Sequence, residues 1–487
     1  MKQVLVITIS LILSLLTNKG SLMAADIVIS DENLAGFLKS GNPNYDQIRL
    51  RTAQVFTSYL QNNDQFATGL NFATTVSESD NPLESPWAQQ QTMAISKKMP
   101  WGLESSLAYV VRKEKFGSTV PVPFANQAYY VPALALNIKM DLWKNLFGAY
   151  DDAKENYLKV LFSQSKINRK LETKQFYNSL RMVYWRLVVQ KRRSKILKNF
   201  VASAKTALSN MKSRQRDSVA DKGAVSEMAA NLSSAEANYR RAQLSTNMLE
   251  RELKNLAPVL LGKKITIKGA YPTIRQAVAD SLECSKTLSS IEGIPYQYTD
   301  YDELVAQIKK GLYWKSQDID KYSAADVSLN FGAQGLGVDQ DFVEAATQPF
   351  GLEKSAYSAT LEISIPLGSP RRTEKFLLAN EREAASIQES QINAQFKSAH
   401  DNLKMNHQAL SEAVRYYHKS IKDQAQVLHF TDQKFRQGRL SVFDYIGSQN
   451  VLLNTKLQVV GVEEQVILDM INYFSLFNQA PCKFNRS

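Results

Sequence analysis

Glycine and proline are absent from two long stretches of this 487-residue chain, residues 149–222 and residues 371–437. These are the residues that most readily interrupt a helix, so nothing local limits helices of about 100 Å, at ~1.5 Å of rise per residue. Helices of ordinary globular domains are several times shorter. The sequence therefore predicts one exceptionally long helix in each half of the chain.

Long uncharged apolar runs are also scarce. Residues 4–16 form one, behind Lys2 and ahead of Ala25, which is the pattern of a secretory signal peptide over residues 1–25. The run is too short for a membrane anchor, and the next best window, residues 459–477, is interrupted by three acidic residues. We therefore expect an exported chain without a transmembrane helix.

Histidine and cysteine are few, with four and two residues respectively. No phosphate-binding glycine loop, CxxC pair or HExxH motif occurs, so we predict a protein that is not an enzyme and has no cofactor. The two cysteines, Cys284 and Cys482, can form a disulfide after export, and two buried thiols are the alternative. His400 and His407 continue an apolar row of the second long helix, which predicts packed side chains; a metal-binding ring of histidines from several copies is the alternative.

Positive charge exceeds negative charge by 12 at neutral pH. Such an excess fits nucleic acid, anionic lipid head groups or an acidic partner, and export argues against nucleic acid. The densest basic cluster, around Lys191, Arg192 and Arg193, falls within the first long helix. We interpret it as a solvated helix face, with contact to a partner protein or to peptidoglycan as the alternative.

What the chain does contain is a repeat. Each long helix is followed by a break that contains glycine and then by a second helical segment, and residues 217–232 are matched by residues 437–452, which lie 220 positions later. That spacing indicates a duplicated half-molecule rather than a solenoid. The predicted parts are a signal peptide (1–25), a first repeat (26–257, with strands about 65–142 and a helical hairpin 149–257), a connecting region (258–322), a second repeat (323–481, with strands about 326–367 and a helical hairpin 371–480) and a tail (482–487).

Before each long helix, apolar and polar residues alternate. Residues 134–142 and 360–367 are the clearest examples, and such a period of two predicts strands with one apolar and one polar face. A soluble sheet with one face on a core is one interpretation, and a lipid-facing barrel of an exported protein is the other. One chain supplies four clear strands and a further hairpin at 91–112, which either joins the barrel or lies outside it. Since a barrel must close, several copies would share it.

Both long helices carry apolar residues at heptad spacing. Phe396, Leu403 and Leu410 form such a seam in the second helix, and Leu197 and Leu208 belong to one in the first. Seams of this kind pack against partner helices. A soluble bundle alone would leave the strands unexplained.

Taken together, the chain resembles the outer-membrane efflux family, the TolC-type channels, over residues 42–481. The resemblance rests on the duplicated order of strands, long helix, glycine break and helix, on the strand-to-helix junction at 363–368, and on Phe435 and Gly438 followed by Asp444. It implies a mainly α fold with a β-barrel part, in which long helical coiled-coil hairpins join transmembrane strands. Three chains would then form one twelve-stranded barrel in outer-membrane lipid and a helical tube across the periplasm.

The resemblance also implies a passive homotrimeric duct that meets a periplasmic adaptor protein and an inner-membrane pump. The glycine breaks would form the inward tip, with Asp444 at the entrance; a helix N-cap or a solvated turn acid is the alternative for Asp444. The implied gate and tip residues are Asp444, Gly438, Arg439 and Phe435 at the gate and Ser218, Val219, Gly223, Leu440 and Ser441 at the adaptor contact. The competing interpretation of the whole chain is an exported helical rod with a structural or adhesive role.

Overall fold

The computed structural model describes residues 27–39, 41–78, 87–115, 127–217, 222–267, 270–293, 300–322, 325–351, 354–365, 372–477 and Cys482. The chain divides into two compact units. The sheet unit comprises residues 50–168 and 303–390, and the helical unit comprises residues 1–49, 169–302 and 391–487.

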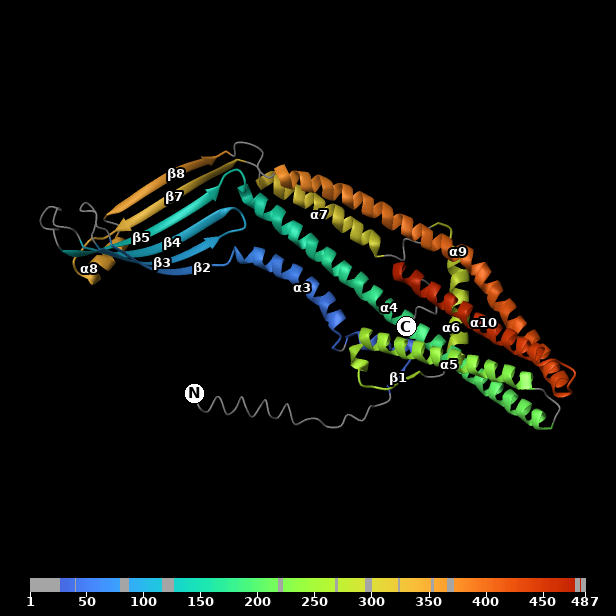
Figure 1. The fold of residues 1–487 in the computed structure, drawn as a ribbon. Coiled ribbons are helices and arrows are strands. Elements are labelled where there is room, and N and C mark those ends of the chain that lie inside the picture. The colour runs from blue at the N-terminus through green and yellow to red at the C-terminus, as the bar shows by residue number, and fades with distance from the viewer. Residues whose placement is uncertain are drawn as a thin grey trace, which may run out of the picture. The chain divides into compact units, whose positions relative to one another are not determined.

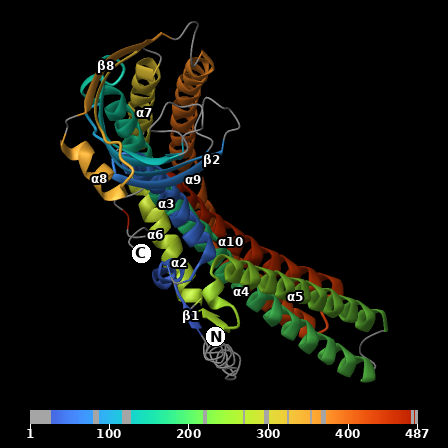
Figure 2. The same ribbon diagram turned by 90° about the vertical axis from the view of Figure 1, so that its left-hand side faces the viewer.

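In the sheet unit, the described residues form one antiparallel sheet of six strands, which we call the large sheet. Its order is β2-β3-β4-β5-β7-β8, so β2 and β8 are its two edges (Figures 1 and 2). The strands are β2 (Gly69–Glu78), β3 (Trp87–Lys98), β4 (Leu103–Lys115), β5 (Ala128–Asp141), β7 (Asp326–Leu336) and β8 (Ser355–Ser364). The β5–β7 pair joins the strands of the first repeat to those of the second.

Helices enter and leave the large sheet at one end. The helix α3 (Pro43–Asp64) precedes β2 and α7 (Tyr301–Tyr322) precedes β7, while α4 (Ala149–Arg216) follows β5 and α9 (Arg372–Arg436) follows β8. Within the sheet unit, α7 is held to both long helices. The amide of Gln164 on α4 donates to the carbonyl of Gln307 at 2.8 Å, and Lys315 pairs with Glu381 on α9 at 2.6 Å.

The hairpin predicted at 91–112 lies inside the large sheet. Strands β3 and β4 fill the space between β2 and β5 and are paired on both sides. The described part of the chain thus places the hairpin within the sheet, which has six strands where the resemblance implied four per chain. The sequence could not decide the point because strand pairing depends on contacts between distant residues, whereas alternation reports each strand separately.

The opposite end of the large sheet carries a short helical segment between β7 and β8. It consists of α8 (Phe342–Thr347) and a 3-10 turn (Gln348–Gly351). Asp341 caps α8, with its carboxylate accepting the backbone N–H of Val343 at 2.7 Å. The hydroxyl of Tyr109 on β4 donates to the carbonyl of Ala346 at 3.1 Å, which ties the segment to the sheet.

The helical unit is built from two hairpins. Helix α4 continues into α5 (Lys222–Leu256), and α9 continues into α10 (Val442–Leu476) after the second glycine break (Figure 1). A shorter helix, α6 (Ala270–Ser289), packs against α10, and a small parallel pair joins β1 (Ile27–Ile29) to β6 (Ile265–Ile267). Helix α9 begins and ends within one residue of the Gly- and Pro-free stretch 371–437, whereas α4 begins with the stretch 149–222 but ends at Arg216, before that stretch does.

The apolar seams form the core of the helical unit. Phe396 and Leu403 of α9 are buried there with Leu180 and Leu187 of α4 and Ile467 of α10. Cys284 of α6 and Cys482 are joined by a disulfide, with their Cα atoms 5.1 Å apart. No described helix is both long and apolar enough to cross a membrane.

Candidate pore wall and helical tip

The large sheet has one apolar face. Side chains that lie opposite one another across all six described strands form rows, and the rows of this face are rich in large apolar residues. Many of them are exposed; Phe72, for example, is 67% exposed. One complete row is Leu70, Ile95, Leu107, Leu136, Ala333 and Tyr357, and the neighbouring rows add Phe72, Met93, Ile138, Phe331, Leu361 and Ile363.

The opposite face carries small and polar side chains. Because side chains alternate along each strand, every residue between two members of the apolar rows points to this second face. The row next to that of Leu70 consists of Gly69, Ser96, Ser106, Asn137, Gly332 and Ser358. No side chain in that row is large. Such a row suits a surface in contact with water better than a packed apolar core.

Aromatic side chains gather where the sheet meets its helices. Trp101, in the β3–β4 turn, and Trp143 and Phe147, just after β5, are all exposed. Tryptophan and other aromatic rings favour the boundary between hydrocarbon and water. An exposed apolar face bordered by such rings fits a membrane-facing wall.

At the helical tip, a short turn joins α9 to α10. Gly438 adopts a φ of +73°, the left-handed conformation that suits glycine at the end of a helix. Ser441 caps α10: its hydroxyl accepts the backbone N–H of Asp444 at 3.0 Å and donates to the Asp444 carboxylate at 2.6 Å. Asp444 therefore lies in the first turn of α10, where the helix dipole favours a carboxylate, and it is exposed.

Phe435 occupies a different environment from Asp444. Its ring is buried in the tip and stacks on Tyr445, with the ring centroids 4.4 Å apart. Arg214, near the end of α4, donates to the carbonyl oxygens of Phe435 at 3.0 Å and Arg436 at 2.6 Å. Both carbonyls belong to the last turn of α9, and that of Phe435 also accepts the backbone N–H of Gly438 at 3.0 Å. Phe435 thus fastens the two hairpins together, a role that the sequence did not predict.

Tyr445 supplies a hydroxyl at this tip. Burial, together with the nearby Asp432, raises the pKa of Tyr445 to about 12, so the phenol stays protonated at neutral pH. Its oxygen accepts a hydrogen bond from the amide of Gln449 at 2.9 Å. A buried polar network of this kind holds a helix turn in one conformation.

The remaining predicted tip residues divide into two groups. Ser218 and Val219 lie outside the described residues. Gly223, Arg439 and Ser441 are exposed, whereas Leu440 is half-buried and packs on the tip core. The exposed members are placed where a partner could reach them.

The histidines predicted as seam residues differ in their surroundings. His400 is buried, and its two ring nitrogens lie 3.3 Å from the hydroxyl of Tyr473 and 3.3 Å from the carbonyl of Ile291. Both nitrogens thus already have a partner, which disfavours a metal there. His407 is half-buried, and burial lowers its pKa. Over the described part of the chain, no cluster of three or more His, Cys, Asp or Glu side chains could hold a metal ion.

The basic cluster of the first long helix is not a solvated face. Arg192 pairs with Glu463, which is only 3% exposed, and Arg193 pairs with Glu464 on α10 at 2.8 Å. Lys191 pairs with Glu250 on α5 at 2.7 Å. The interpretation from sequence is therefore wrong for these three residues, because their acidic partners lie far away in the chain.

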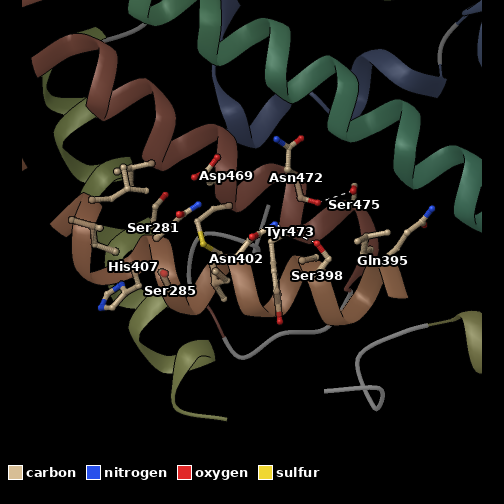
Figure 3. A pocket seen from close by; sticks show the side chains of 18 of the residues that line it. Ser281, Ser285, Gln395, Ser398, Asn402, His407, Asp469, Asn472, Tyr473 and Ser475 are labelled. Carbon is tan, nitrogen blue, oxygen red and sulfur yellow. Dashed lines mark hydrogen bonds between the residues drawn. The ribbon is translucent and has the colours of Figure 1, made fainter. Parts of the chain in front are cut away.

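A pocket of about 690 Å³ lies among α6, α9 and α10 (Figure 3). Its polar lining includes Ser281, Asn402, His407 and Asp469. Burial raises the pKa of Asp469. The described hydrogen bonds join none of its serines to His407.

Known proteins provide the comparison for this geometry. No family model matches the chain, and no curated protein is significantly similar in sequence. Solved structures do match: the channel-forming protein CusC (10% identity, covering 93% of each chain, TM-score 0.64) and the outer-membrane protein VceC from Vibrio cholerae (14%, 92% of this chain and 96% of that one, 0.63). The outer-membrane channel CmeC from Campylobacter jejuni also matches (12%, 92% and 86%, 0.65). The chain has the fold of these outer-membrane proteins, which is the fold that the resemblance to TolC-type channels implied.

Proposed function

We propose that this chain is the subunit of a passive exit duct, anchored in the outer membrane by its large sheet and extended into the periplasm by its long helices. The observation that carries the proposal is the large sheet, whose exposed face is apolar and whose other face is small and polar. A wall between hydrocarbon and a water-filled lumen needs this division. The fold shared with outer-membrane channels supports it.

The edges of the large sheet support assembly from several copies. A membrane sheet must close because hydrocarbon cannot satisfy unpaired backbone groups, and six strands, as found in the described residues, are fewer than the eight of the smallest barrels. Strand direction alternates from β2 to β8, so β8 of one copy can pair antiparallel with β2 of the next. A homotrimer is the copy number that the resemblance to TolC-type channels implies.

The helical tip is the proposed entrance. Three copies would bring three Asp444 carboxylates around one axis, which favours cations at that point. Gly438 and Arg439 lie in the same turn, and the buried ring of Phe435 packs in the core beneath it. Gly223, Leu440 and Ser441, together with Ser218 and Val219, form the proposed contact with a periplasmic adaptor protein, through which an inner-membrane pump supplies cargo and energy.

The second interpretation, a soluble helical rod, is disfavoured by the same sheet. Phe72, Leu361 and Ile363 would each leave a large apolar side chain more than half exposed to water. Contiguous exposed faces of large apolar side chains are rare on soluble monomers.

Extraction and conductance of the full exported protein test the proposal. We expect it in the outer-membrane fraction, soluble only with detergent, with a mass of three chains, and conducting ions in a planar bilayer. A monomer that remains in the aqueous fraction and gives no conductance would overturn the proposal.

A further inference from the structure

The β3–β4 hairpin distinguishes this sheet from the four-stranded contribution that the sequence resemblance implied. The hairpin is continuous with its neighbours over its full length. Pairing with β2 runs from Gly69 opposite Ser96 to Glu78 opposite Trp87, and pairing with β5 includes Leu103 opposite Met140. A flap lying outside a barrel would not be hydrogen-bonded to a neighbouring strand at each of its two edges.

The base of the hairpin is fixed to the start of the long helix. Lys98, the last residue of β3, pairs with Asp151 in the first turn of α4 at 3.1 Å, and the Asp151 carboxylate also accepts a hydrogen bond from the amide of Asn145 at 2.6 Å. Gly148 approaches the turn so closely that an added Cβ would lie 2.0 Å from the carbonyl oxygen of Pro100. The hairpin therefore shares its anchor with β5 and α4, the elements that define the wall.

The two faces of the hairpin match those of the rest of the sheet. Met93, Ile95 and Leu107 continue the apolar rows and are 43–44% exposed, whereas Ser96 and Ser106 continue the small polar row. A hairpin that only capped the outside of a barrel would have water on its outer face and no need for this division. Over these rows its alternation is that of a membrane-spanning wall, and the polar residues of the same face, Gln89, Gln91 and Lys97, lie nearer the ends of β3.

We propose that each subunit contributes all six strands of the large sheet, so that three subunits close an eighteen-stranded barrel instead of a twelve-stranded one. This inference rests on the proposed function, since it needs three copies in a membrane. With strands about 4.8 Å apart and tilted by roughly 40°, eighteen strands give a backbone diameter of about 36 Å, against about 24 Å for twelve.

The wider barrel changes where the duct selects its cargo. The inward row that begins at Gly69 is made only of glycine, serine and asparagine, whereas inward rows nearer the ends of the strands carry Lys98, Glu104, Lys139 and Arg112. Barrels of sixteen to eighteen strands leave an open aqueous channel. Large hydrated cargo would therefore find the barrel widest at the Gly69 row, and charged side chains nearer its two ends would share selection with the helical part of the duct.

Electron cryo-microscopy of the detergent-solubilised full-length protein tests the inference directly. We expect a ring of three subunits with eighteen strands in the barrel wall and β3 and β4 between β2 and β5. A trimer whose wall has twelve strands, with the hairpin outside it, would overturn the inference and leave the proposed function intact. A monomer without a closed barrel would instead overturn the proposed function.

Cysteine labelling provides an independent test in a lipid bilayer. The two native cysteines are joined in a disulfide, so single cysteines can be introduced at Ile95 and Leu107 on the apolar face and at their neighbours Ser96 and Ser106. In proteoliposomes, we expect Ser96→Cys and Ser106→Cys to react with a charged, water-soluble maleimide more than about tenfold faster than Ile95→Cys and Leu107→Cys, because hydrocarbon covers the apolar face. Equal rates at all four positions would place the hairpin in water and contradict the inference.

Discussion

The ammonium group of Lys98 lies 3.1 Å from a carboxylate oxygen of Asp151. The first is the last residue of β3 and the second lies in the first turn of α4, so one ion pair joins the hairpin to the helix that leaves the sheet. Asp151 is 3% exposed at its side chain and Lys98 25%. The pair is thus largely shielded from solvent. Charge interactions in such a shielded site are stronger than at an open surface.

Replacing Lys98 should loosen this junction. We expect Lys98→Met to lower the free energy of unfolding by about 1–3 kcal/mol, because the buried Asp151 carboxylate keeps its amide donor but loses its cation. Thermal denaturation of the purified protein measures the loss. In Lys98→Met/Asp151→Asn the second substitution should cost less than it does alone, and strictly additive losses would show that the two residues do not interact.

Replacing Arg192 should lower the free energy of unfolding by more than replacing Lys98 does. The carboxylate of Glu463 is buried against Arg192, with His418 3.4 Å away. We expect Arg192→Leu to destabilise the helical unit by about 3–5 kcal/mol, since it leaves a buried charge without its main partner. The double variant Arg192→Leu/Glu463→Leu removes both charges and should recover most of the loss in thermal stability; no recovery would contradict the assignment.

The Cys284–Cys482 disulfide should stabilise the helical unit. The bond closes a loop across a sequence separation of 198 residues. On a chain-entropy argument, such a loop is worth at most about 5 kcal/mol. We expect a reducing agent to lower the thermal midpoint of the protein and to leave that of Cys284→Ser/Cys482→Ser unchanged. An identical response of the two proteins to the reductant would exclude a role for the bond.

Lys174 should make stability depend on pH. Burial, with the like charge of Lys170 adding to it against the opposing effect of Asp300, lowers the pKa of Lys174 to about 8. Between that value and the unfolded value of about 10.5, the unfolded chain binds a proton that the folded chain does not, so stability rises with pH across this window and falls as pH drops through 8. We expect Lys174→Met to flatten the pH profile of the thermal midpoint between pH 8 and 10 and to raise the midpoint at pH 7. A profile unchanged by the substitution would contradict the lowered pKa.

The charge of Asp444 can be separated from its hydrogen bond to Ser441. Asp444→Asn retains an oxygen that can accept the Ser441 hydroxyl and removes only the charge, whereas Asp444→Ala removes both. We expect both variants to weaken block by divalent cations in a planar bilayer, because the proposed trimeric entrance would lose its three carboxylates. Asp423→Ala, a change of an exposed acid elsewhere on α9, serves as the control. Block that is unchanged in both Asp444 variants would remove this residue from the gate.

Local patterns predicted most of the fold. The long helices were predicted because no residue between Ala149 and Arg216 interrupts them, and the strands because apolar side chains alternate along each one. Both signals act within a few residues of the chain.

The interactions between distant residues were not predictable in this way. Arg192 and Glu463 are 271 positions apart, and neither has a local feature that indicates its partner. The stacking of Phe435 on Tyr445 depends on how tightly the α9–α10 turn closes. The position of the β3–β4 hairpin depends on the register of strands on both sides, which periodicity does not specify.

The two edges of the large sheet have a consequence for how the protein is made. In the described part of the chain, β2 and β8 each have a paired strand on one side only, and such edges adhere to extended polypeptides. In the proposed trimer, ring closure would remove every such edge in one step, so partial assemblies would gain little protection. A chain awaiting this assembly would therefore need β2 and β8 kept apart from other polypeptides until the ring closes.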